Sequence, residues 1–211
     1  MAPTTIRKLQ ALGLAAALVL DSALPSRRHP LTQALLAAAL VAITKAPLGF
    51  RPPALCSGLR VGSAAACVVT VAVAAGSALP RVRAAMADRT PPASPAMWLA
   101  LRIPVGTVWP EEAAYRAALT TLAAAGFGRR TGRLVQAIAF GLSHIPDARA
   151  AGEAVAGTVV VTAAAGWVFG ALAERSGSLA APLLTHLAIN EAGALAALRV
   201  QSGKGGIHDE R

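Results

Sequence analysis

Apolar runs of helical length, separated by short polar segments, make up most of this chain. Two of these runs are clean, because residues 61–80 and 154–173 each carry 20 uncharged residues. About 20 apolar residues cross the hydrocarbon core of a bilayer as a helix. The runs are rich in Ala, Leu and Val and lack the alternation of polar and apolar residues that marks a barrel strand. The pattern therefore predicts transmembrane α-helices.

Shorter apolar runs add further helices. We expect an all-α, polytopic transmembrane helical bundle of about six to eight membrane helices. Three spans fall in residues 1–96, a helical core in 97–200 and a polar tail in 201–211. The run at 9–20 resembles a signal-peptide core, but no small-x-small cleavage site follows it, so an uncleaved first membrane helix is favoured. The remaining runs are residues 31–44, 97–108, 134–145 and 179–200.

Composition narrows the class of protein. The chain is 55% hydrophobic and only 14% charged, which is typical of an integral, multi-pass membrane protein surrounded by lipid. The net charge of +10 is dispersed over the polar segments, as at Arg27/Arg28 and Arg129/Arg130. Such residues contact lipid headgroups. A nucleic-acid surface would need a continuous basic stripe interleaved with aromatic residues, and aromatics make up 4% of this chain. We therefore expect no nucleic-acid binding.

Three charges interrupt the apolar sequence between residues 103 and 128. Glu112 and Arg116 are four residues apart with the acid first, which favours an ion pair along one helix. Glu111 lies about 100° from Glu112 around the helix and therefore outside this ion pair. Its carboxylate is left free for chemistry. Pro110 predicts that a helix begins at this point. The alternative is a helix end at the membrane surface with three solvated charges, although ionisable residues in membrane helices generally indicate function.

Three further polar residues lie in the C-terminal apolar runs. His144 ends the run that contains Phe140, and His186 and Asn190 are four residues apart and share one helix face. Each alone is compatible with a hydrogen bond between membrane helices. Packing their helices against Glu111 would place one acid, two imidazoles and one amide in a polar cavity. Such a set can deprotonate water and stabilise an oxyanion.

These residues form three ordered motifs: Glu-Glu-x-x-x-Arg at 111–116, Phe-x-x-x-His at 140–144 and His-x-x-x-Asn at 186–190. The motifs resemble those of the CPBP intramembrane proteases, which include the CAAX prenyl endoproteases and the bacteriocin-processing Abi-type proteins. The resemblance covers roughly residues 97–198. It implies an intramembrane, glutamate-dependent endopeptidase that needs no cofactor. It also implies a peptide or protein substrate, prenylated or leader-bearing.

The resemblance also implies a role for each motif residue. Glu111 would be the general base and would activate water together with His144. His186 and Asn190 would polarise the scissile carbonyl and hold the oxyanion. Three further residues would support this site by orienting the motifs: Glu112, Arg116 and Phe140.

Three alternatives remain open at the level of sequence. Glu111, His144 and His186 could bind zinc with an open fourth position, although the chain has no His-Glu-x-x-His motif and Asn is a poor zinc ligand. A non-catalytic membrane scaffold or immunity-type protein could retain the motifs, and a transporter could use the same ionisable groups. The presence of all four candidate catalytic residues favours the protease. The polar groups also do not form a relay across several spans.

Overall fold

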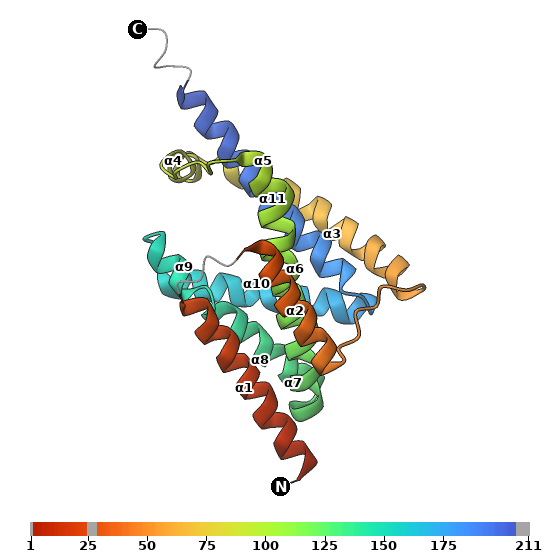
Figure 1. The fold of residues 1–211 in the computed structure, drawn as a ribbon. Helices are drawn as coiled ribbons and strands as arrows, with labels where there is room; N and C mark the ends of the chain where they lie inside the picture. The colour runs from red at the N-terminus through yellow and green to blue at the C-terminus, as the bar shows by residue number, and fades with distance from the viewer. Residues whose placement is uncertain (1, 25–28, 206–211) are drawn as a thin grey trace.

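The computed structural model describes residues 2–24 and 29–205, and every regular element in these ranges is helical. The predicted all-α class is therefore confirmed. Six long helices form the framework, and shorter helices connect them (Figure 1). The long helices are α1 (Pro3–Ala23), α2 (Pro30–Thr44), α3 (Ala54–Ser77), α8 (Arg129–Leu142), α10 (Val155–Ser176) and α11 (Ala180–Gly205).

The first motif lies inside one continuous helical segment, residues 95–127, which we call the motif helix. Much of this segment has π-helical geometry, which is frequent at functional sites. Its elements are α5 (Pro95–Met97), η1 (Trp98–Arg102), η2 (Pro104–Val108), α6 (Trp109–Glu111), η3 (Glu112–Leu119) and α7 (Thr120–Phe127).

The prediction that a helix begins at Pro110 is wrong. The motif helix begins at Pro95, after Ser94, whose hydroxyl accepts a hydrogen bond from the Met97 N–H at 3.4 Å. In an α-helix, an internal proline removes one hydrogen bond and clashes with the carbonyl four residues earlier. Pro110 instead lies between two π-helical stretches, in which the bonding pattern differs from that of an α-helix. The two glutamates are therefore not at a helix N-terminus.

Two predicted boundaries also differ from the structure. A short helix, α4 (Pro80–Ala87), lies between α3 and the motif helix, and the predicted helix at 134–145 corresponds to α8, which begins at Arg129. A short helix, α9 (Ile145–Ala150), follows α8. The last helix continues to Gly205, so the predicted polar tail starts within α11. Residues 206–211 lie outside the described part of the chain.

The N-terminal helices pack directly on the C-terminal core. Helices α3 and α11 lie side by side, as Figure 1 shows, and α8 packs against α7 and α10. Leu14 and Leu18 of α1 and Leu40 of α2 cover the cluster around Tyr115 and Leu119. The Trp109 indole N–H donates to the carbonyl oxygen of Ala34 in α2 at 3.1 Å. Helices α1 and α2 thus help to enclose the first motif.

Within the described parts of the chain, two helices, α3 and α10, are long and apolar enough to cross a membrane. Each carries exposed valines on its outer face, including Val68 and Val71 in α3 and Val160 and Val161 in α10. A face of exposed branched aliphatic residues suits lipid contact. A bundle of six to eight membrane helices stays a prediction.

Candidate functional site

The two glutamates of the first motif occupy different surroundings. The side chains of Glu112 and Arg116 are both 0% exposed, and Arg116 Nε lies 3.4 Å from Glu112 Oε2. The ion pair expected from the spacing is therefore present. Among the described residues, none of the three guanidinium nitrogens has a hydrogen-bond partner. The Arg116 guanidinium instead lies 3.8 Å from the ring centre of Phe140 and 5.0 Å from that of Phe169. Electrostatic and cation–π attraction therefore hold this buried charge.

His186, from the third motif, lies between both glutamates. Its Nδ1 is 2.8 Å from Glu112 Oε1, and its Nε2 is 3.8 Å from Glu111 Oε2. An ionised carboxylate only accepts hydrogen bonds, so Nδ1 carries the proton that faces Glu112. The ring of Phe169 stacks on His186 with a centroid distance of 5.1 Å. The imidazole is thus fixed in position on two sides.

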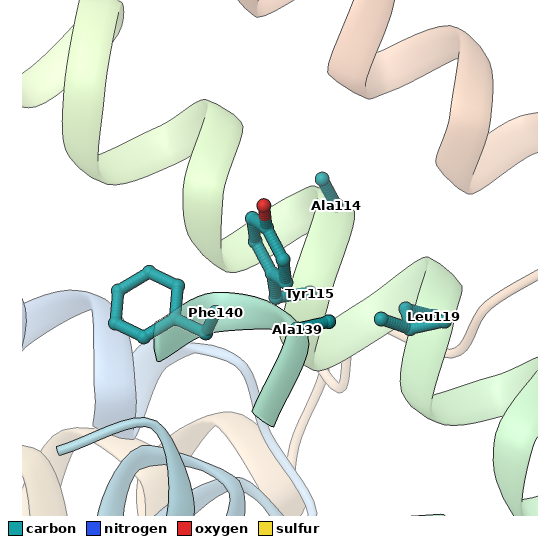
Figure 2. Close-up of a cluster of buried hydrophobic side chains, with 5 residues drawn as sticks. All are labelled: Ala114, Tyr115, Leu119, Ala139 and Phe140. Atoms are coloured by element: carbon teal, nitrogen blue, oxygen red, sulfur yellow. The ribbon is translucent and has the colours of Figure 1, made fainter. Parts of the chain in front are cut away.

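His144 lies in the turn between α8 and α9. Its Nδ1 is 2.7 Å from the carbonyl oxygen of Phe140, which only accepts. Nδ1 is therefore the donor, and Nε2 is left as the acceptor of the neutral ring. The Phe140 ring contacts His144 edge-on at 4.6 Å and Tyr115 at 5.2 Å between centroids. Figure 2 shows Tyr115 on the motif helix and Phe140 on α8.

Glu111 and His144 line the same cavity, which has a volume of about 360 Å³. The Glu111 side chain is 28% exposed, whereas Glu112 is fully buried, so Glu111 is the accessible acid of the pair. Helices α1 and α2 form the opposite wall of the cavity. Polar residues in the lining include Asp21, Gln33, Tyr115, Ser143 and Asp147.

Asn190 does not line the cavity of Glu111 and His144. It lines a second cavity of about 1200 Å³, together with Trp98 and Arg102. The structure therefore brings Glu111, His186 and the buried Glu112–Arg116 pair together and places His144 on the cavity of Glu111. Asn190 follows one turn after His186 and borders the neighbouring cavity.

Several residues of this site did not emerge from the sequence. Phe169 stacks on His186 and faces Arg116, and Asp21 lines the cavity of Glu111. Asp21 did carry one signal, because it is an acid at the end of the apolar run 9–20. Phe169 carried no comparable signal, since aromatic residues are ordinary in membrane helices.

The zinc alternative requires three side chains that converge on one point. Within residues 2–24 and 29–205, no group of three or more His, Cys, Asp or Glu side chains has an arrangement that could hold a metal ion. Glu111, His144 and His186 therefore do not fit a zinc site in this geometry. Catalysis without a cofactor stays a prediction, with zinc dependence as its alternative.

Comparison with protein families agrees with these motifs. Residues 93–192 match the family model of the Rce1-like type II CAAX prenyl endopeptidases. Over these residues the chain is similar to the CPBP family. The match includes all three motifs, so the expected resemblance is confirmed. No curated protein and no solved structure matches the chain. Similarity to this family implies a membrane protease that acts on peptides or proteins.

Proposed function

We propose that this chain is an intramembrane endopeptidase in which Glu111 is the general base. The observation that carries the proposal is the contrast between the two adjacent acids. Glu111 is accessible from the cavity that His144 also lines, whereas Glu112 is buried against Arg116 and His186. A general base must reach the water that it deprotonates. Only Glu111 meets this requirement.

Glu111 and His144 would position and activate the attacking water. With Nδ1 of His144 bonded to the Phe140 carbonyl, the free Nε2 can accept a hydrogen bond from this water. Glu111 takes the proton as the water oxygen attacks the scissile carbonyl. The same carboxyl group then returns the proton to the leaving amine, which balances the hydrolysis without a covalent intermediate.

The scissile carbonyl would lie between the two cavities, where His186 and Asn190 would stabilise the oxyanion. Because Nδ1 of His186 faces Glu112, only Nε2 can act on the substrate, and it does so as a donor when the ring is protonated. Asn190 lies one turn further along the same face of α11 and offers an amide donor. Donors aimed at the developing negative charge contribute strongly to catalysis of acyl transfer.

The experiment that tests the proposal is cleavage of peptides by detergent-purified protein, wild type beside Glu111→Gln. The peptide set includes farnesylated CAAX peptides and unmodified leader-like peptides, each incubated with and without a strong chelator. We expect cleavage by the wild type, none by Glu111→Gln, and no effect of the chelator. Chelator-sensitive cleavage would instead favour the zinc-dependent enzyme. Absence of cleavage across the set would favour the non-catalytic scaffold.

A further inference from the structure

The larger cavity differs in character from the cavity that holds Glu111. It lies between α4, the η1 part of the motif helix and α11, and its volume is about 1200 Å³. Its apolar wall includes Val82 and Met86 of α4 and Trp98, Leu101 and Ile103 of the motif helix. An apolar wall of this extent between helices suits a hydrocarbon chain.

The charges of the two cavities are opposite. Arg89 and Arg102 line the larger cavity, and its lining within the described residues includes no Asp or Glu. The smaller cavity is lined by Asp21, Glu111 and Asp147, and by no Lys or Arg of the described residues. Basic pockets between membrane helices bind anionic lipid headgroups. The larger cavity therefore combines a cationic edge with a wall for an acyl chain.

Helix α4 and the residues that follow it, which line one side of this cavity, are held by contacts with distant segments. The Gln201 side-chain amide donates to the carbonyl oxygens of Met86 and Arg89 at 3.1 and 2.9 Å, which ties the end of α4 to α11. Arg89 also pairs with Glu153, just before α10, at 2.8 Å. These contacts join three segments that are distant in sequence, so the cavity has a defined shape.

From this geometry we propose that the larger cavity binds one anionic phospholipid. The phosphate lies near Arg102 and Arg89, and an acyl chain lies against Trp98, Leu101 and Met86. Because Glu153 neutralises part of the charge of Arg89, Arg102 contributes more to binding. Trp98 suits this position, since tryptophan favours the boundary between headgroups and acyl chains. The proposal does not depend on proteolysis.

The first test is native mass spectrometry of the full chain in detergent, titrated with phosphatidylglycerol or phosphatidylcholine of matched chain length. We expect tighter binding of one phosphatidylglycerol, and about fivefold weaker binding in Arg102→Gln, from about 1 kcal/mol per basic residue. Arg83→Gln is the matched control, because Arg83 is an exposed arginine of α4 outside the cavity lining. Equal affinity for the two lipids, or equal effects of the two substitutions, would overturn the proposal.

Two further arms identify the ligand and locate it. Glycerol phosphate, which carries the anionic head without acyl chains, should not displace the lipid; full displacement would show a phosphate site instead. In a Trp109→Phe/Trp167→Phe variant, Trp98 is the remaining tryptophan. We expect saturable quenching of its fluorescence by phosphatidylglycerol with brominated chains, and much less by the corresponding phosphatidylcholine. Equal quenching by both would indicate contact with bulk lipid and contradict the proposal. Binding is measured without cleavage, so its failure and that of the protease assignment are separate results.

Discussion

Glu112 Oε1 and His186 Nδ1 are 2.8 Å apart, although 74 residues separate them in the chain. This contact joins the first motif to the third. It places the proton of His186 on Nδ1. The other ring nitrogen, Nε2, faces Glu111 Oε2 at 3.8 Å. Glu112 also carries the ion pair with Arg116. Glu112 is therefore a positioning residue that orients the imidazole, whereas Glu111 faces the cavity.

Replacement of either adjacent glutamate should abolish cleavage, but only replacement of Glu112 should also lower the stability of the fold. Glu112→Gln leaves the buried Arg116 without its counter-charge, and breaking a buried ion pair typically costs about 3–5 kcal/mol. We expect a lower Tm and a lower folded yield, together with loss of cleavage. Glu111→Gln is the matched control: it should abolish cleavage while its Tm stays close to that of wild type. Thermal unfolding in detergent and peptide cleavage measure both effects. An unchanged Tm for Glu112→Gln would show that the buried pair does not stabilise the fold.

The sequence predicted contacts within one helix and missed contacts between helices. The Glu112–Arg116 pair and the shared face of His186 and Asn190 follow from helical periodicity alone. The Glu112–His186 contact depends on how the motif helix packs against α11, which spacing does not specify. For the same reason, the sequence did not place Asn190 on the neighbouring cavity. The start of the motif helix was also missed, because a proline between two π-helical stretches cannot be told from a proline at a helix start by its neighbours in the sequence.

Phe140 should be required for the packing of all three motifs. Its ring contacts Arg116 and Tyr115 of the first motif and His144 of the second. Its ring centre also lies 6.3 Å from that of His186 in the third motif, and Phe140 is almost fully buried. Phe140→Ala should destabilise the protein by about 3–5 kcal/mol, the usual cost of removing a buried phenylalanine. Phe140→Leu keeps much of the volume but removes the cation–π contact, so a smaller loss is expected. Thermal unfolding of both variants in the same detergent provides the comparison. Equal stability of Phe140→Ala and wild type would contradict the packing role.

The contact between α3 and α11 depends on glycine at position 62. A Cβ there would lie 2.8 Å from the Ala181 Cα, which is backbone and cannot move away without shifting the helix. Gly62→Ala should therefore cost about 1–3 kcal/mol, as overpacking typically does. Gly76→Ala, in the same helix, is the matched control because its Cβ would meet nothing within 4 Å. We expect a lower Tm for Gly62→Ala alone. Because α11 carries His186, cleavage by that variant should fall as well.

Asn190 provides the most direct test of the proposed oxyanion site. If its amide stabilises the oxyanion, Asn190→Ala should lower kcat by about 10²–10³-fold, as removal of one such donor does elsewhere. The Asn190 side chain is partly exposed at a cavity, so the Tm should change little. Thr107→Ala is a suitable control, because Thr107 lines the same cavity and lies outside all three motifs. Single-turnover cleavage by both variants separates chemistry from product release. Equal rates for Asn190→Ala and Thr107→Ala would remove Asn190 from the catalytic set, leaving it as a wall of the larger cavity.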